Sequence, residues 1–233
     1  MNNFQVKPYS NIAKIGLDKL EGTQCSLNES SDSPDGILIR STKLAEGHIK
    51  DGLKAISRAG AGVNNIPIDL CTDKGIVVFN TPGANANAVK ELVLAGLMLS
   101  SRNVYASIDF VNGLSHLEQM KDLEPFLEEN KKSFKGTELA GSTLGVVGLG
   151  AIGSKVASMG VALDMNVVGY DPALSVEAAW RLPSEVVPAE SMKDLFGISD
   201  FISIHIPALD STKGIINEEL FKNANNLSLL NFA

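Results

Sequence analysis

Residues 143–153 read TLGVVGLGAIG, and this stretch decides the fold. The apolar run 143–149 predicts a buried strand, and residues 151–163 predict the helix that follows it. Between them lies the pattern GxGxxG, in which the first glycine makes a tight turn and the second lets the backbone approach a pyrophosphate. The third glycine lets the helix pack closely on the strand. The pattern therefore predicts a dinucleotide site built on Gly148, Gly150 and Gly153.

A carboxylate follows the next predicted strand at the spacing this kind of site requires. Residues 166–170 predict that strand, and Asp171 ends it, about 20 residues after the last glycine. A carboxylate there accepts hydrogen bonds from the adenosine ribose and repels a 2′-phosphate, so Asp171 predicts NAD rather than NADP. Its alternative role is a surface aspartate that opens the Asp171-Pro172 turn. The pyrophosphate is expected at the helix N-terminus, near Ala151.

Strand-like and helix-like segments alternate on both sides of this motif, which predicts an α/β fold with parallel sheets. The longest predicted helix, 89–102, is apolar on most sides, and we place the domain boundary there. Residues 1–102 are expected to form a flavodoxin-like domain, and 103–233 a doubly wound Rossmann domain. Residues 107–136 predict a solvated helix and connector. The remaining predicted helices are 11–20, 44–53, 191–196 and 218–223, and the remaining strands 37–39, 55–58, 76–79, 186–187, 200–206 and 227–231.

Composition excludes several classes of protein. The chain has 233 residues, 44% of them hydrophobic and 20% charged, with a net charge of −7 and no basic run, so we expect no nucleic-acid partner. The longest apolar stretch, 92–99, is too short to cross a membrane, and the first residues lack the apolar core of a signal peptide. Two cysteines without a CxxC pattern predict reduced thiols and a cytoplasmic protein. Three scattered histidines predict no metal site.

Several motifs together resemble a known family. The glycine motif, Tyr170-Asp171-Pro172, His205-Ile206-Pro207 and Asn231-Phe232-Ala233 resemble the NAD-dependent D-isomer-specific 2-hydroxyacid dehydrogenases. In the first half, residues 39–42 (IRST), 58–66 (RAGAGVNNI) and 75–82 (GIVVFNTP) are similar to the 3-phosphoglycerate branch of that family. The resemblance runs from about Gly36 to Ala233.

The resemblance implies a substrate site in the first domain. Arg40, with Ser41 beside it, falls on the family's contact to a substrate phosphate, which suits a guanidinium. Ala61, Gly62 and Val63 fall on the loop whose backbone N–H groups hold the substrate carboxylate. The alternatives are a structural arginine at a strand end and a simple tight turn.

It also implies a cofactor site for NAD. The residues implied are Ala61 at the nicotinamide end, Gly148, Gly150, Ala151, Ile152 and Gly153 at the pyrophosphate, Asp171 at the ribose, His205, Ile206 and Pro207 at the adenosine side, and Phe232 and Ala233 near the nicotinamide. His205 has an alternative structural role, because no acid or base partner for it is visible in the sequence.

The family's catalytic arginine, glutamate and histidine would lie beyond Ala233. We therefore expect no catalytic residue in this chain, and slow or absent hydride transfer from it alone. The predicted strand 227–232 should be buried on both faces, so an end at Ala233 would leave an open sheet edge. For these reasons we expect the chain to be a fragment or partial chain.

The expected activity is oxidation of 3-phosphoglycerate to 3-phosphohydroxypyruvate, the entry to serine biosynthesis. One alternative keeps the chemistry but takes glycerate, hydroxypyruvate or another unphosphorylated 2-hydroxyacid. Another, of a different class, is an NAD-sensing or corepressor-like binding protein, because a fold does not fix a function. The apolar residues 92–99 lie in the region through which related enzymes dimerise, so we expect a homodimer. The other partner that we expect is a small-molecule substrate.

Overall fold

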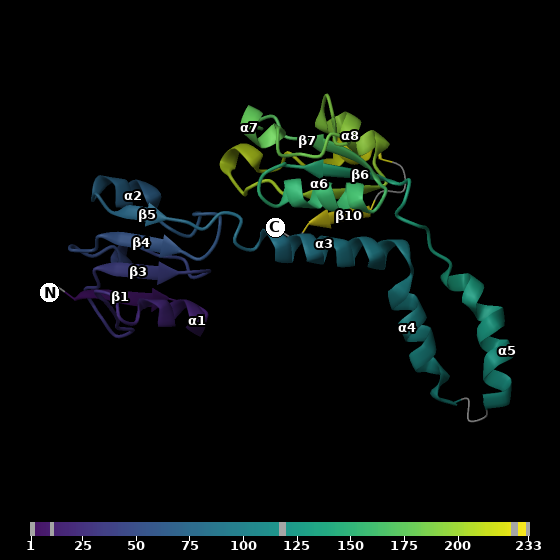
Figure 1. The fold of residues 1–233 in the computed structure, drawn as a ribbon, viewed down its shortest axis with the longest axis horizontal. Coiled ribbons are helices and arrows are strands. Elements are labelled where there is room, and N and C mark those ends of the chain that lie inside the picture. Colours follow the sequence, from purple (N-terminus) through teal and green to yellow (C-terminus); the bar gives the residue numbers. More distant parts are fainter. Residues whose placement is uncertain (1–2, 10–11, 117–119, 225–227, 232–233) are drawn as a thin grey trace. The chain divides into compact units, whose positions relative to one another are not determined.

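The computed structural model describes residues 3–9, 12–116, 120–224 and 228–231. The chain divides into two compact units, one of residues 1–85 with 208–211 and the other of residues 86–207 with 212–233. Each unit contains one five-stranded sheet whose paired strands are all parallel (Figure 1). The predicted α/β class is confirmed.

The sheet of the first unit has the strand order β2-β1-β3-β4-β5. Counted along the chain this is 2-1-3-4-5, the order of flavodoxin-like folds. Buried side chains such as Ile37, Ile39 and Ile56 form its core. The elements of this unit are β1 (Phe4–Tyr9), α1 (Lys14–Leu17), η1 (Asp18–Leu20), β2 (Cys25–Leu27), β3 (Gly36–Ile39), η2 (Glu46–His48), β4 (Ala55–Arg58), α2 (Ile68–Asp73) and β5 (Val77–Phe79).

Two strands of this sheet, β1 and β2, were not predicted. Strand β1 reads FQVKPY, in which residues 4–7 alternate between apolar and polar, but Pro8 interrupts this short pattern. Proline is tolerated because β2 pairs only with residues Phe4 to Val6. The Val6 carbonyl points to the β2 side, where it accepts from the Asn28 N–H, so Pro8, two residues on, faces the flank beyond the end of β2.

The helix predicted at 44–53 is wrong. Only the short 3-10 turn η2 forms there, because Ala45 before it is extended and the backbone leaves helical geometry again at Ile49, with φ −89° and ψ 77°. Leu44, Ile49 and Leu53 are nevertheless buried in the core, so their spacing reflects a loop that packs its apolar side chains inward. The helix predicted at 11–20 is shorter in the structure, as α1 and η1.

The sheet of the second unit has the order β10-β9-β6-β7-β8. If β6 to β10 are numbered 1 to 5 along the chain and the sheet is read from β8, the order is 3-2-1-4-5, which is the Rossmann order. The elements of this unit are α3 (Ala86–Ser101), α4 (Val104–Asn112), η3 (Gly113–His116), α5 (Met120–Asn130), η4 (Lys131–Phe134), β6 (Thr143–Val147), α6 (Gly153–Ala162), β7 (Asn166–Tyr170), α7 (Val176–Ala179), β8 (Val187–Pro188), α8 (Met192–Ile198), β9 (Phe201–Ile204), α9 (Glu218–Phe221) and β10 (Ser228–Asn231). The short turn η5 (Asp210–Thr212) begins in residues assigned to the first unit and ends in the second.

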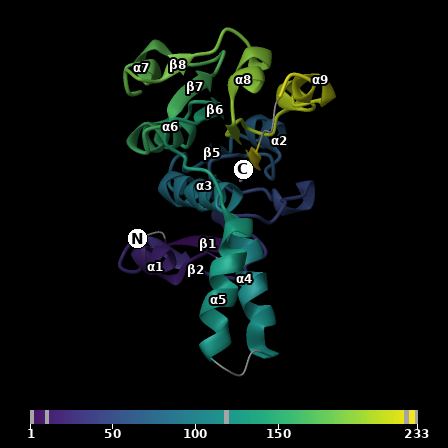
Figure 2. The ribbon, with the colours of Figure 1, turned by 90° about the vertical axis from the view of Figure 1, so that its right-hand side faces the viewer.

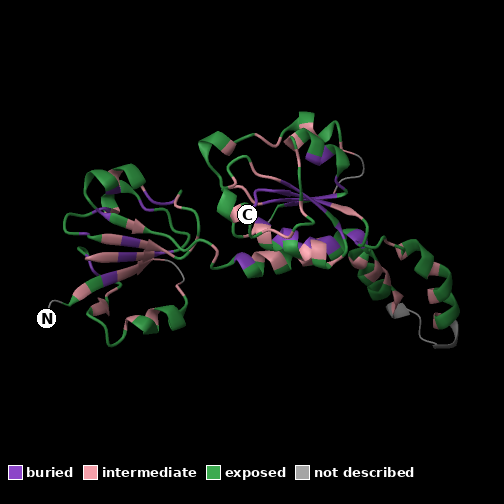
Figure 3. Cartoon of the chain, turned by 45° about the horizontal axis from the view of Figure 1, so that its top comes forward, coloured by how far each residue is buried: buried purple, intermediate pink, exposed green. Residues whose placement is uncertain are grey.

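Both faces of this sheet are covered, as the doubly wound prediction requires. On one face Val93 and Leu97 of α3 and Val156 of α6 join the strands in one buried cluster. On the other face Leu195 and Phe196 of α8 pack on Val147, Ile202 and neighbouring residues. Figure 3 shows the strands of this sheet as largely buried. The central strands β6 and β9 are therefore buried on both sides, as a parallel sheet demands.

The structural division of the chain differs from the boundary expected at residue 102. Helix α3 belongs to the second unit, because its buried face packs on α6 and on β10. Along the chain, the first unit consequently ends at residue 85 and the second begins at residue 86. The opposite face of α3 stays exposed, with Leu92 and Leu99 each about half accessible.

Helices α4 and α5 lie side by side (Figure 2). The Phe110 ring stacks on Phe126 with centroids 5.8 Å apart, and it also meets Phe134 at 5.0 Å. Glu128 of α5 forms an ion pair with Lys131, the first residue of the 3-10 turn η4. The segment 107–136, predicted as a solvated helix and connector, is largely helical in its described residues.

Strand β10 differs from the expectation of a strand buried on both faces. Its only strand partner among the described residues is β9, and Leu229 is 40% exposed whereas Leu230 is buried. Within the described ranges, none of the helices has the length and apolar character needed to span a bilayer.

The Phe196 side chain should be the main contributor to stability on one face of the second sheet. It is fully buried and meets the Phe221 ring edge-on at 5.5 Å. We expect Phe196→Ala to lower the free energy of unfolding of this unit by about 3 to 5 kcal/mol, because it removes apolar contact and leaves a cavity. Urea unfolding followed by circular dichroism measures this. Trp180→Ala, at an 86% exposed position, is the control and should change it by less than about 0.5 kcal/mol; equal effects would contradict the packing described.

Candidate functional site

The predicted glycine motif forms the turn between β6 and α6. Gly148 has a φ of +87°, and a Cβ there would lie 2.7 Å from the His205 carbonyl oxygen. A Cβ on Gly153 would overlap the Gly148 carbonyl oxygen, so α6 begins in direct contact with the turn. A Cβ on Gly150, in contrast, would meet nothing within 4 Å. The space above Gly150 is therefore open to a ligand, as the motif requires.

The amide groups of this turn offer a site for an anion. Among the described residues, the N–H groups of Gly150, Ala151 and Ile152 have no hydrogen-bond acceptor. Helix α6 follows at Gly153, with Ile152 as its N-cap residue, slightly later than the start expected near Ala151. Free N–H groups and the positive end of a ten-residue helix together favour a phosphate or pyrophosphate.

Asp171 connects this turn to the neighbouring strand. One carboxylate oxygen accepts a hydrogen bond of 2.9 Å from the Leu149 N–H, and the other accepts one of 3.0 Å from the Ala173 N–H. Each oxygen retains a lone pair for a further donor. The carboxylate therefore both opens the turn at Pro172 and presents an acceptor beside the glycine motif, so the two roles considered for it are compatible.

A cavity of about 300 Å³ lies against this carboxylate. Leu149 comes from the glycine turn, Asp171 from the end of β7 and Glu190 from the segment after β8; the other lining residues are Gly169, Tyr170, Pro172, Leu174, Pro188 and Ala189. The lining is mainly apolar, with two carboxylates at its rim. These features fit the adenosine half of a dinucleotide, and the open Gly150 fits its pyrophosphate.

His205 follows β9 and lies beside the glycine turn. Its Nε2 is 2.8 Å from the Ser203 hydroxyl, and its Nδ1 is buried without a hydrogen-bond partner in the described structure. Burial lowers the pKa of His205 to about 4, so the ring is neutral at pH 7. A neutral ring held by a serine suits a positioning role better than proton transfer. Ile206 also approaches Gly148, and the Pro207 carbonyl accepts from Thr212.

The predicted substrate residues lie at the carboxyl ends of β3 and β4. Arg40 and Ser41 are exposed just after β3, and the loop of Ala61, Gly62 and Val63 follows β4. Among the described residues these three loop N–H groups have no acceptor. The same unit therefore offers these three amides and the Arg40 side chain, which forms no ion pair in the described part of the chain, as a site for an anionic substrate requires.

Two residues that hold this loop were not singled out from the sequence. The Arg58 Nε donates to the Arg40 carbonyl at 3.1 Å, and its guanidinium lies 2.9 Å from where a Gly62 Cβ would be. Asn65 is buried and donates through Nδ2 to the carbonyls of Arg40 and Thr42. A signal for Arg58 existed in the sequence, because it ends a predicted strand directly before the glycine-rich loop.

The structure thus gathers the predicted residues into two groups, one in each unit. Arg40, Ser41, Ala61, Gly62 and Val63 belong to the first, and Gly148, Gly150, Ala151, Ile152, Gly153, Asp171, His205, Ile206 and Pro207 to the second. Phe232 and Ala233, expected near the nicotinamide, lie outside the described residues.

Comparisons with known proteins agree with this geometry. Residues 106–233 match the family model described as D-isomer specific 2-hydroxyacid dehydrogenase, NAD binding domain. A D-3-phosphoglycerate dehydrogenase of Methanocaldococcus jannaschii is 36% identical over 201 residues, which are 84% of this chain and 35% of the relative. A hydroxypyruvate reductase of Thermotoga maritima is 39% identical over 189 residues, 79% of this chain and 55% of the relative. The chain thus spans about a third to a half of the length of these relatives.

Solved structures agree as well. The NAD⁺-bound 3-phosphoglycerate dehydrogenase of Entamoeba histolytica superposes with a TM-score of 0.69 at 26% identity, covering 96% of this chain and 69% of that one. A D-lactate dehydrogenase from Aquifex aeolicus, solved with NAD and lactic acid, has a TM-score of 0.77 at 24% identity and shows the same fold. The matched family model covers more than half of the chain. The chain therefore belongs to the NAD-binding, D-isomer specific 2-hydroxyacid dehydrogenases.

Proposed function

We propose that this chain binds NAD through its second unit and forms part of an oxidoreductase acting on a 2-hydroxyacid. The observation that carries the proposal is the Asp171 carboxylate, fixed by the Leu149 N–H beside an open glycine turn. Gly150, Ala151 and Ile152 would hold the pyrophosphate and Asp171 the adenosine ribose. When bound, NAD supplies the hydride acceptor. The chain's own residues bind and orient the cofactor. The neutral His205 ring keeps its contact with the Ser203 hydroxyl and transfers no proton.

We further propose 3-phosphoglycerate as the substrate, which would place the protein in serine biosynthesis. Arg40 is exposed, and its backbone carbonyl is held by Arg58 and Asn65, so its guanidinium is available for a phosphate. The D-3-phosphoglycerate dehydrogenases among the relatives support this substrate. Hydroxypyruvate is the second candidate, favoured by the T. maritima relative of that name.

A homodimer in the cytoplasm completes the proposal. Large apolar side chains are exposed along α3 and α4, namely Leu92, Met98, Leu99, Tyr105, Ile108 and Val111. Figure 3 shows exposed residues along both helices. Apolar surface of this extent on consecutive helices is typical of an interface between subunits. We assign the surface to a second copy of the chain.

Gly150→Ala tests the cofactor site without disturbing the fold. No atom lies within 4 Å of the added methyl, and Gly150 has no positive φ, so stability should stay within about 0.5 kcal/mol. The same methyl would occupy the space of the pyrophosphate, and we expect NAD affinity, measured by calorimetry, to fall about tenfold or more. Gly16→Ala, at an equally open position in α1, is the control. An NAD affinity unchanged by Gly150→Ala would refute the assignment.

Arg40→Gln tests the phosphorylated substrate. In a chain that also carries the family's downstream arginine, glutamate and histidine, we expect the KM for 3-phosphoglycerate to rise about tenfold or more, because a charge-assisted contact is lost. The KM for D-lactate, which has no phosphate, should stay within about twofold. Lys43→Gln, a nearby exposed cation, is the control. Equal changes for both substrates would favour an unphosphorylated 2-hydroxyacid.

Leu99→Arg combined with Ile108→Arg tests the subunit interface. Charges on this apolar surface should shift the protein from dimer to monomer in sedimentation velocity, since each would be buried without a partner. Val176→Arg, another exposed apolar position in the second unit, should leave the dimer intact. A double variant that remains dimeric would show that the interface lies elsewhere.

A further inference from the structure

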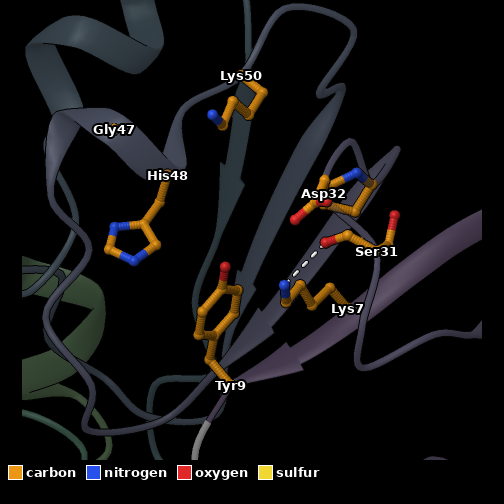
Figure 4. A pocket seen from close by; sticks show the side chains of 8 residues that line it. Lys7, Tyr9, Ser31, Asp32, Gly47, His48 and Lys50 are labelled. Atoms are coloured by element: carbon orange, nitrogen blue, oxygen red, sulfur yellow. Dashed lines mark hydrogen bonds between the residues drawn. The ribbon is translucent and has the colours of Figure 1, made fainter.

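The first unit contains a polar cavity that the proposed function does not use. It has a volume of about 170 Å³ and is lined by Lys7, Tyr9, Ser31, Asp32, Pro34, Gly47, His48 and Lys50 (Figure 4). Neither Arg40 nor the loop after β4 contributes to the lining. The volume corresponds to a few water molecules or one small ion.

One lining residue of the cavity, Tyr9, lies at the edge where ligands bind in open parallel sheets. Such sheets bind ligands beyond the carboxyl ends of two neighbouring strands whose connections run in opposite directions along the sheet. In the order β2-β1-β3-β4-β5 these strands are β1 and β3. Tyr9 is the last residue of β1 and pairs with Ile39, the last residue of β3. Gly47, His48 and Lys50 belong to the segment between β3 and β4, and Ser31, Asp32 and Pro34 to the segment between β2 and β3.

Most polar groups around the cavity are hydrogen-bond donors held in place by the fold. The Lys7 amine donates to the Ser31 carbonyl at 2.8 Å and lies 5.4 Å from the Tyr9 ring centre, which leaves it further protons to donate. The Tyr9 hydroxyl points into the space between the side chains (Figure 4). Lys50, which is exposed, adds a second ammonium at the rim.

The His48 ring completes this set. Its Nδ1 is 3.0 Å from the Ala45 amide nitrogen and 3.2 Å from the Ala45 carbonyl oxygen, so the backbone engages that nitrogen in either tautomer. Nε2 is then the ring nitrogen available to a ligand. The ring also meets Tyr9 edge-on at 5.5 Å, which fixes the positions of both.

Charge decides which ligand fits. The lining contains two lysines, Lys7 and Lys50, and one carboxylate, that of Asp32. None of these three side chains forms an ion pair within the described part of the chain. The cavity is thus locally cationic in a chain whose net charge is −7. Ammonium, hydroxyl and imidazole donors converging on a small space suit an oxyanion with several acceptors.

We propose that this cavity is a second anion site, which binds a phosphate group as inorganic phosphate or as a small phosphate monoester. Lys7, Tyr9, His48 and Lys50 donate to its oxygens, and the Asp32 carboxylate limits its affinity by repulsion. The site is separate from Arg40 and does not depend on the substrate proposed above. Its occupation would link Tyr9 of β1 to the segment 47–50, next to the strand end from which Arg40 extends.

The test is a titration of the 233-residue chain with inorganic phosphate at constant ionic strength, followed by amide NMR. We expect saturable shifts in residues 7–9, 31–34 and 47–50 with a Kd of the order of 1 mM. Lys50→Gln and Tyr9→Phe should each weaken binding about fivefold. Asp32→Asn should strengthen it about threefold, because it removes a repelling charge. Lys50 and Asp32 are exposed, so these two variants should fold normally.

Matched variants separate a local site from a general charge effect. Lys19→Gln and Glu29→Gln change exposed charges of the same unit outside the lining and should alter the Kd by less than about twofold. Arg40→Gln should also leave it unchanged. Shifts confined to residues 40–42 and 58–65, loss of binding in Arg40→Gln, or equal effects of Lys50→Gln and Lys19→Gln would overturn the proposal.

The source of the phosphate group follows from competition. Glycerol phosphate that displaces inorganic phosphate from residues 7–9 and 47–50 would support a monoester as the natural occupant. Failure to displace it would support the free anion.

Discussion

The close contact of helix α6 with strand β6 is the constraint on which the second unit depends. It requires glycine at Gly153, where any side chain would overlap the Gly148 carbonyl, and it is close again at Gly160, where a Cβ would lie 2.8 Å from the end of the Leu144 side chain. Because the helix lies this close, its first amides face the turn, and the Leu149 N–H reaches the Asp171 carboxylate. The same backbone arrangement of β6, the glycine turn and α6 therefore determines both how the helix packs and where the cofactor site lies.

Groups that attract anions are concentrated at a few places in this acidic chain. Each predicted binding region pairs a fixed backbone with groups that attract anions: free amides and a helix N-terminus at Gly150, free amides and Arg40 at the loop after β4, and lysines beside Tyr9. Amides and helix dipoles supply this attraction without adding net charge. A net charge of −7 is therefore compatible with three places suited to anionic groups.

The sequence predicted best where one local rule determines the structure. The strand 166–170 and the strand 55–58 were placed with their observed bounds, and the glycine turn and Asp171 lie together as expected. Strand β1 was missed because its alternating pattern covers only residues 4–7 before Pro8 interrupts it, and the rest of the strand is defined by its pairing with β3. Residues 44–53 were taken for a helix because a loop that buries Leu44, Ile49 and Leu53 imitates helical spacing. Arg58 and Asn65 act through contacts with the Arg40 carbonyl, which local pattern cannot reveal.

Pro8 has a consequence for how the first sheet ends. Strand β2 stops beside Val6, so the remainder of β1 has an open flank on that side. An open flank is a template on which a strand from another molecule could assemble. Pro8 lacks the one amide hydrogen that would face an incoming strand there, so such a strand would meet a gap in the ladder. The residue that concealed β1 from sequence-based prediction thus makes this flank of the sheet a poor template for a further strand.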